Sequence, residues 1–374
     1  MKQIRIDAFG VPSQAARCVE VAAPGAPSAW EVLVDVEACA INPADLARLA
    51  GRYGELPRLP ATVGLEAVGR VVACGASVRE LAVGDRVIVI GNDNWCQQKR
   101  VAASQVFKVA PELDPLQLAA LKVNACTALE LVRRHAALER GAWIVQTAPL
   151  SGVGRAVMQI ARHDGLRTLN IVRRADAIAQ VCAAGGDVAL FDGPELTQAA
   201  QAVTGGAPMM LALDAVGGDG VARLAPLLER GATIVNYGML SGRPVQLDSD
   251  ALIFRGIGLK GFWLTQRLAR MTLAQRDALM AEAVELLRAG VLQVEVAAAY
   301  PLEAVGKALR HVDEPGRRGK VYLLPNGPIG LSGSVGPVVP IAGVAASSQS
   351  TSPVPATSGH LWTDIRDVHE TRTA

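Results

Sequence analysis

The sequence is poor in aromatic residues, in closely spaced cysteines and in any excess of charge of one sign. Aromatic side chains make up only 4% of the 374 residues. The six cysteines are scattered without a C-x-x-C pair, which argues against a zinc knuckle and against a disulfide framework. Basic residues number 37 and acidic residues 35, without a long block of either sign, so we expect no nucleic-acid partner. Apolar runs of membrane-spanning length are also missing, so we expect no membrane partner.

Hydrophobic residues, by contrast, make up half of the chain. A chain of 374 residues exceeds the length at which one hydrophobic core usually stops growing, so two structured domains are expected. The abundance of apolar residues excludes disorder of the whole chain.

The first part of the chain has the pattern of a β-rich unit. Valines at 32, 34 and 36 alternate with other residues, as in a strand buried on one face. Short apolar runs at 68–73 and 86–90 lie between glycines. Residues 1–119 are therefore predicted to form a compact β-rich domain.

The middle of the chain alternates apolar strands with helical patterns, which is typical of a doubly wound parallel sheet. The predicted strands are Ala142–Ala148, Thr168–Val172, Asp187–Phe191, Met209–Ala215, Ala232–Tyr237 and Leu259–Leu264. We predict an α/β domain with a six-stranded sheet over residues 120–265. A long amphipathic helix is predicted between Thr272 and Gly290, within a segment 266–326 that returns to the first domain. Residues 327–374 lack an apolar periodicity and are predicted to be a disordered tail.

A nucleotide-binding turn is predicted directly after the first of these strands. Ser151, Gly152, Val153 and Gly154 follow the strand and open a helix. Small residues here let a pyrophosphate approach the free backbone amides at the helix N-terminus. Glycines also occur in strand-to-helix turns for steric reasons alone, so the turn gains its meaning from the βα units around it.

The end of the second strand indicates which dinucleotide binds. NAD enzymes carry an acidic residue there to hold the ribose diol, whereas this chain has Arg173 and Arg174. Two guanidinium groups suit a 2′-phosphate, which predicts NADPH. Asp176 is close enough in sequence to leave NADH as the alternative, and a solvated helix start is the purely structural interpretation.

Several motifs together resemble the mitochondrial-type 2-enoyl thioester reductases, a zinc-free branch of the medium-chain dehydrogenase/reductase superfamily. The matching runs are 41–45 (Ile-Asn-Pro-Ala-Asp), 51–54 (Gly-Arg-Tyr-Gly), 151–154 (Ser-Gly-Val-Gly), 252–254 (Leu-Ile-Phe) and 261–264 (Gly-Phe-Trp-Leu). The resemblance covers residues 1 to about 325. It implies a GroES-like β-rich catalytic domain joined to a Rossmann domain.

The zinc-ligand positions of the superfamily are occupied here by residues that cannot bind zinc. By motif position Asn42 replaces the first catalytic cysteine, and Leu65 replaces the histidine that precedes Glu66. A catalytic zinc needs three protein ligands, so we expect no metal.

The resemblance also assigns roles to individual residues. Tyr53 is the candidate catalytic acid, because a phenol stays protonated at neutral pH; a surface-loop tyrosine is the alternative. Asn124 should face the nicotinamide, and Lys320 should approach a phosphate. The residues expected around the rest of the cofactor are Tyr237, Gly238 and Met239 beneath it, and Phe262, Trp263 and Leu264 from the last strand. Each of these could instead be a core residue or, for Lys320, a surface charge.

The resemblance implies NADPH-dependent reduction of a trans-2-enoyl thioester, linked to coenzyme A or to an acyl carrier protein. An NADPH:quinone oxidoreductase of the same fold is the closest alternative. A non-catalytic NADPH-binding protein is the alternative of another class. The resemblance further implies a homodimer joined through the strand near 259–264. No presequence is recognisable, so a cytoplasmic location is expected.

Overall fold

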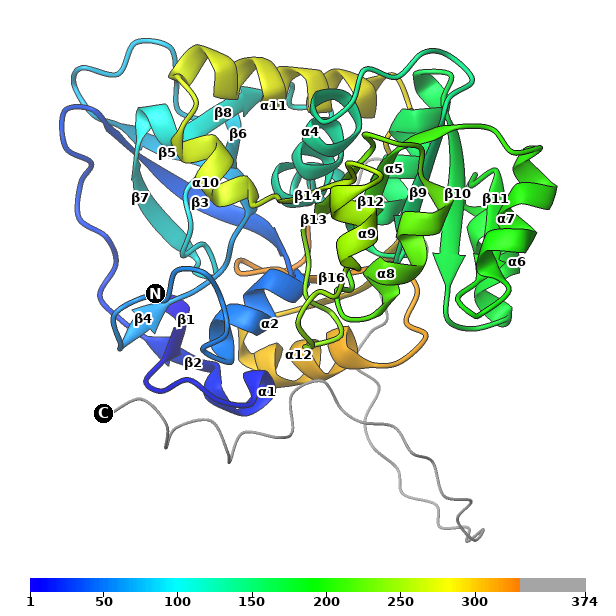
Figure 1. Cartoon of the computed structure of the whole chain (residues 1–374). Coiled ribbons are helices and arrows are strands. Elements are labelled where there is room, and N and C mark those ends of the chain that lie inside the picture. Colours follow the sequence, from blue (N-terminus) through cyan, green and yellow to red (C-terminus); the bar gives the residue numbers. More distant parts are fainter. Residues whose placement is uncertain (330–374) are drawn as a thin grey trace, which may run out of the picture.

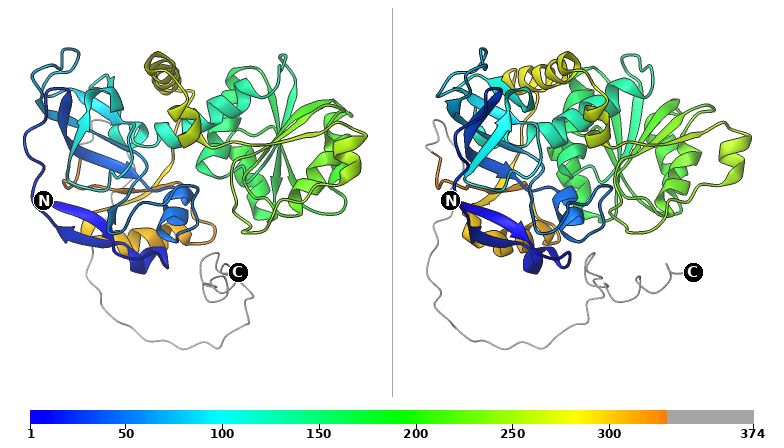
Figure 2. Two further views of the ribbon diagram at one scale, coloured as in Figure 1. Left: turned by 60° about the vertical axis from the view of Figure 1, so that its left-hand side comes forward. Right: turned by 90° about the vertical axis from the view of Figure 1, so that its left-hand side faces the viewer.

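The computed structural model describes residues 1–329 and has two units side by side (Figure 1). One unit is built from both ends of this range, and the other from the middle of the chain (Figure 2). The predicted tail, residues 327–374, lies outside the described residues apart from its first three. No helix in the described range is long and apolar enough to cross a membrane.

The larger sheet of the first unit has the order β15-β16-β3-β5-β6-β8, and β7 also pairs with β3. Its strands are β3 (Glu31–Ala40), β5 (Ala67–Cys74), β6 (Arg86–Val89), β7 (Gln98–Ala102), β8 (Val106–Val109), β15 (Val296–Tyr300) and β16 (Lys320–Leu323). The alternating valines predicted at 32, 34 and 36 are fully buried in its core. Strand β16 pairs antiparallel with β3, so the end of the chain completes a sheet that the beginning starts.

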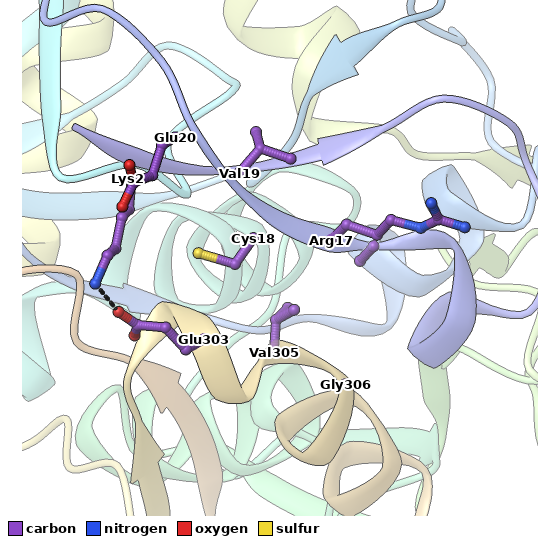
Figure 3. Close-up of a pocket in the computed structure, with 9 residues that line it drawn as sticks. Lys2, Arg17, Cys18, Val19, Glu20, Glu303, Val305 and Gly306 are labelled. Atoms are coloured by element: carbon purple, nitrogen blue, oxygen red, sulfur yellow. Dashed lines mark hydrogen bonds and ion pairs between the residues drawn. The ribbon is translucent and has the colours of Figure 1, made fainter.

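A three-stranded sheet and short helices complete this unit. They are β1 (Lys2–Ile6), β2 (Arg17–Glu20), β4 (Ala61–Thr62), α1 (Pro12–Ala15), α2 (Pro43–Leu49), α12 (Val305–Asp313), η1 (Ala103–Gln105) and η4 (Leu302–Ala304). A pocket lies between β2 and the η4–α12 segment, with the Lys2–Glu303 ion pair on its wall (Figure 3). The residues that line it include none of the predicted site residues.

The second unit is a six-stranded parallel sheet, as predicted, and its strand order is β11-β10-β9-β12-β13-β14. The strands are β9 (Trp143–Thr147), β10 (Arg167–Val172), β11 (Val188–Phe191), β12 (Met209–Asp214), β13 (Thr233–Asn236) and β14 (Gly258–Gly261). The last strand was predicted too long. It ends at Gly261, and Leu264 already begins helix α10 (Leu264–Ala269).

Helices cover both faces of this sheet. They are η2 (Leu121–Ala125), α4 (Cys126–Arg134), α5 (Gly152–His163), α6 (Asp176–Ala183), α7 (Leu196–Thr204), α8 (Gly220–Leu224), η3 (Ala225–Leu227) and α9 (Ser249–Ile253). Two further helices lie toward the first unit: α3 (Pro115–Leu118) packs on β3 and β5, and α11 (Leu273–Arg288) packs on α4, η2 and β8. Neighbouring residues of β9 point to opposite faces: Ile144 packs with α4, α5 and α11, and Val145 with α7 and α8. The long helix α11 agrees with its prediction, because Thr272 caps it and Gly290 ends it with a φ of 71°.

Segment η2 is a π-helical turn that leads directly into α4. Such turns are rare, and they change which side chains a helix presents to its neighbours.

The domain limits predicted at 119, 265 and 326 stay predictions.

Candidate functional site

The turn after β9 provides free backbone donors at the carboxyl edge of the parallel sheet. Ser151 precedes α5, and its hydroxyl accepts a hydrogen bond from the Gly154 amide at 3.1 Å. The amides of Gly152 and Val153, in the first turn of the helix, have no intrahelical acceptor. The N-terminal end of a helix also carries partial positive charge, so this turn can bind a phosphate group.

Glycine is required twice in this turn for steric reasons. A Cβ at Gly152 would overlap Asn124 Oδ1, and it would lie 3.0 Å from Asn124 Cγ and 3.5 Å from Lys320 Nζ. A Cβ at Gly154 would lie 2.6 Å from the carbonyl oxygen of Ala148. Ala148 itself has a φ of 48°, so the turn is tight before the helix begins.

A buried carboxylate, Asp214, holds the neighbouring strand ends together. Its oxygens accept hydrogen bonds from Thr147 Oγ1 at 2.8 Å and from Asn236 Nδ2 at 2.7 Å. The backbone amide of Gly217 adds a third at 2.8 Å. The ends of β9, β12 and β13 are therefore tied to one side chain beside the glycine turn.

Asn124 and Lys320 face this turn from the side of the first unit. Lys320 Nζ donates to Asn42 Oδ1 and, at 3.3 Å, to Asn124 Oδ1. Asn42 Nδ2 in turn donates to Glu66 Oε1 at 2.7 Å. Burial lowers the pKa of Lys320 to about 8, so the ammonium is still charged at neutral pH. The structure thus brings two predicted residues, Asn124 and Lys320, to the predicted turn.

Tyr53 lies beyond α2 and contacts the segment that follows β14. Trp263 Nε1 donates to Tyr53 Oη at 2.8 Å, and the two rings meet edge to face with centroids 5.6 Å apart. Gly54 packs on the same indole, where a Cβ would lie 3.1 Å from the ring. Burial raises the pKa of Tyr53, while hydrogen bonds with the Trp263 and Thr265 side chains oppose the rise. The phenol is therefore protonated and keeps its own proton available for donation.

Phe262, Trp263 and Leu264 were predicted on the last strand, and this is wrong. They follow Gly261, where β14 ends, because the chain turns there toward Tyr53 and into α10. Phe262 packs edge to face on His135, with ring centroids 5.9 Å apart. Leu264 is buried in the hydrophobic core instead of lining an open site.

The other predicted residues lie in different environments. The Tyr237 hydroxyl is buried, and burial is the main cause that raises its pKa. Gly238 packs against the backbone of Ala215, where a Cβ would lie 2.5 Å from the carbonyl oxygen. Met239 is 57% exposed.

Arg173 and Arg174 are exposed at the carboxyl end of β10. Arg174 Nε lies 3.3 Å from a carboxylate oxygen of Asp176. Its guanidinium also lies close to Gly316, in the loop before β16. A Cβ built on Gly316 would be 3.3 Å from Arg174 Nη1. Both arginines are thus free of buried partners and open to solvent.

Three buried charged residues near this site were not predicted: Asp45, Lys122 and Asp214. Asp45 was detectable in sequence, since Asn42-Pro43-Ala44-Asp45 has the spacing of a capping box, and both of its hydrogen bonds form. Lys122 and Asp214 stand in apolar segments, where no local pattern distinguishes them from surface charges.

Comparison with known proteins agrees with this architecture. A family model described as alcohol dehydrogenase GroES-like domain matches residues 28–113, and one described as zinc-binding dehydrogenase matches residues 185–323. The human protein named mitochondrial enoyl-[acyl-carrier-protein] reductase is 35% identical over 296 residues, which are 76% of this chain and 78% of that protein. The chain belongs to the medium-chain dehydrogenase/reductase superfamily.

Solved structures of this superfamily have the same fold. A mycobacterial protein solved with NADPH is 27% identical and superposes with a TM-score of 0.78, covering 87% of this chain and 100% of that one. The quinone oxidoreductase of Escherichia coli, also solved with NADPH, is 24% identical with a TM-score of 0.79 and the same coverage. This medium-chain protein is an oxidoreductase with a GroES-like and a Rossmann-like domain.

The zinc that one family description names does not fit the residues of this medium-chain protein. No group of three or more His, Cys, Asp or Glu side chains in residues 1–329 has a geometry for a metal ion. Glu66 is the one carboxylate at the expected motif, and its oxygens accept from Asn42 Nδ2 and from the Val123 amide at 2.8 Å. Two lysine ammonium groups lie in the same region, where a cation would be repelled.

Proposed function

We propose that this protein uses NADPH to reduce the α,β double bond of a trans-2-enoyl thioester. The observation that carries the proposal is the half-buried phenol of Tyr53, held by Trp263 at 2.8 Å beside the carboxyl edge of the parallel sheet. Similarity to the enoyl reductases, at 35% identity with the human protein, supports this substrate class.

The cofactor fits the residues of the turn. Gly152 and Gly154 let Asn124 and the Ala148 backbone pack directly against the turn, and the helix N-terminus supplies free amides for a pyrophosphate. Arg173 and Arg174 are the groups that would hold a 2′-phosphate. NADPH, when bound, supplies the hydride that an electron-poor alkene accepts at Cβ.

The residues of this chain then have two tasks. The carbonyl oxygen of the thioester gains negative charge as its Cβ is reduced, and hydrogen-bond donors in a desolvated site stabilise that charge. Cα must also receive a proton. Tyr53 can do either, because its raised pKa keeps the hydroxyl protonated and Trp263 donates to the phenolic oxygen without using the phenolic hydrogen. No metal is needed, since the conjugated carbonyl already activates the alkene.

The test is the oxidation of NADPH with crotonyl-CoA by the wild-type protein and by Tyr53→Phe. We expect kcat to fall by about 100-fold or more, within the range found for loss of a general acid. The Kd for NADPH should stay unchanged. Tyr300→Phe is the matched control, because it removes another phenol with a single side-chain partner, His311 at 3.0 Å, far along the chain. Wild-type activity in Tyr53→Phe would remove Tyr53 from the mechanism.

A quinone reductase is the second candidate, favoured by the fold shared with the quinone oxidoreductase of Escherichia coli. A quinone accepts hydride without a positioned acid, so its turnover should not depend on Tyr53. Rapid reduction of a naphthoquinone, with none of crotonyl-CoA, would establish this alternative. Binding of NADPH without turnover of either substrate would indicate the non-catalytic protein.

We also propose a homodimer that pairs through β14. This strand lies at the end of the parallel sheet described here, and Leu259 on it is 40% exposed. Pairing with a second copy would satisfy its open backbone groups. Whether the thioester is linked to coenzyme A or to an acyl carrier protein, and whether the protein is cytoplasmic, stay predictions.

A further inference from the structure

Six buried polar side chains lie where the two units meet, and we call them the seam cluster. They come from α2, from the loop before β5, from η2 and from β16: Asn42, Asp45, Glu66, Lys122, Asn124 and Lys320. Such a set is costly to bury unless every charge and every hydrogen-bonding group has a partner. The proposed chemistry uses only the face of this cluster that meets the glycine turn.

The hydrogen bonds of the cluster run in one direction. Lys320 can only donate, and it donates to the oxygens of both amides, Asn42 and Asn124. An ionised Glu66 can only accept, and it accepts from Asn42 Nδ2 at 2.7 Å, from Asn124 Nδ2 at 3.5 Å and from the Val123 amide at 2.8 Å. The orientation of both amides, and with it the Asn124 oxygen that meets Gly152, is therefore set by Lys320 on one side and by Glu66 Oε1 on the other.

Lys122 is the second cation of the cluster and has a complete set of acceptors. Its Nζ donates to the carbonyl oxygens of Leu65 at 2.6 Å and Gly91 at 3.4 Å, and to Asn92 Oδ1 at 3.4 Å. Three acceptors match the three hydrogens of an ammonium group. Burial lowers its pKa to about 8, and the negative charge of Glu66 is the main influence that opposes this. The ammonium is thus still charged at neutral pH, beside the residue that precedes Glu66.

The remaining groups that face Glu66 do not replace this charge. Asp45 accepts from the amides of Asn42 at 2.8 Å and Leu65 at 3.0 Å, and burial raises its pKa to about 7. Cys39, Cys126 and Tyr322 also face the cluster, and burial raises the pKa of each, so they stay neutral. Lys122 and Lys320 are therefore the cations that offset the carboxylates.

We propose that Lys122 is a positioning residue for the nucleotide turn. Together with Lys320 it supplies positive charge beside Glu66, and this charge keeps Glu66 ionised. A proton on Oε1 would face the donors of Asn42 and Asn124, and a proton on Oε2 would face the Val123 amide, so at least one of these hydrogen bonds would be lost. The inference rests on the proposed NADPH site, but not on the identity of the substrate.

The test is the Kd for NADPH between pH 5.5 and 9, measured by nucleotide fluorescence with Lys122→Met, Lys122→Arg and Lys99→Met. Lys99 is the matched control: it is a second lysine largely removed from solvent, and it donates to carbonyl oxygens of Asn92 and Asp93, in the loop that Lys122 also contacts. Removing the Lys122 charge should raise the pKa of Glu66 further. As the pH is lowered, the variant should therefore lose its affinity for NADPH at a higher pH than the wild-type protein does. We call this loss of affinity on the acid side the acid limb, and we expect it to move up by about one pH unit and the Kd at pH 7 to rise about tenfold.

Lys122→Arg should restore the wild-type acid limb, because it restores the charge, and Lys99→Met should leave it in place. An acid limb that does not move in Lys122→Met, or one that moves equally in Lys99→Met, would overturn the proposal.

If Lys122→Met does not fold, the double variant with Glu66→Gln decides. It should recover a higher Tm than Lys122→Met alone, because no buried carboxylate is left unpaired. A double variant no more stable than the single one would also refute the proposal. Failure of the wild-type protein to bind NADPH would instead contradict the proposed function, and the Tm comparison would still test the cluster.

Discussion

Gly152→Ala is the substitution whose effect follows most directly from the geometry of the site. The added methyl group would overlap Asn124 Oδ1 and lie 3.0 Å from Cγ. To restore ordinary contact, the Asn124 amide has to move by about 1 Å. Its hydrogen bonds with Ala120 at 3.1 Å and Asn42 at 3.2 Å would then be strained or lost.

The magnitude can be worked from these contacts. Two hydrogen bonds at about 1 kcal/mol each give a destabilisation of about 2 kcal/mol, within the range typical of overpacking. The methyl group also occupies the approach to the helix N-terminus, so we expect the Kd for NADPH to rise by about 30-fold or more, equivalent to about 2 kcal/mol.

Gly220→Ala is the matched control. Gly220 is also the first residue of a helix, α8, but the nearest atom to its Cβ is Arg223 Nη2 at 3.6 Å. This variant should gain up to about 1 kcal/mol of stability, because alanine favours the helix, and it should keep wild-type affinity. Tm from thermal unfolding and Kd from NADPH fluorescence give the two readouts. Equal affinities of Gly152→Ala and the wild-type protein would show that the nucleotide does not bind at this turn.

Two further predictions concern the cofactor phosphate and the oligomer. Arg173→Ala and Arg174→Ala should each weaken NADPH binding by about 10-fold or more while leaving NADH binding unchanged, since each removes a charged contact to the 2′-phosphate. Parallel titrations with both nucleotides check this. An equal loss of affinity for NADH would contradict it. Leu259→Lys should convert the proposed dimer to a monomer in sedimentation experiments, whereas Phe191→Lys on the opposite edge strand β11, where Phe191 is 55% exposed, should not. A dimer that persists in Leu259→Lys would exclude pairing through β14.

The sequence predicts the parallel sheet well, because its strands are apolar runs bounded by turn residues. The end of β14 was misplaced because Phe262 and Trp263 are apolar whether or not they pair in a sheet. Their real environment depends on Tyr53, about 210 positions away, through the Trp263 hydrogen bond. No window of neighbouring residues contains that information.

The residues of the candidate site also differ in whether the local sequence reveals them. The glycine turn is local, so Ser151 and Gly154 could be found from spacing alone. Lys122 lies in the apolar segment Leu121–Ala125, and its acceptors are 30 and more residues earlier. Asp214 similarly joins the ends of strands that are distant in sequence. Buried charges of this kind acquire a role only from residues that the fold brings together.

The pairing of β16 with β3 also determines the order in which this protein can be completed on the ribosome. All strands of the parallel sheet lie between residues 143 and 261, so this unit can close while the rest of the chain is still being made. The GroES-like unit has to wait for Tyr322 and Leu323, which pair with Ala40 and Cys39. Lys320 is therefore the last residue of the proposed nucleotide site to emerge, and a nascent chain that stops short of it has the glycine turn without its ammonium.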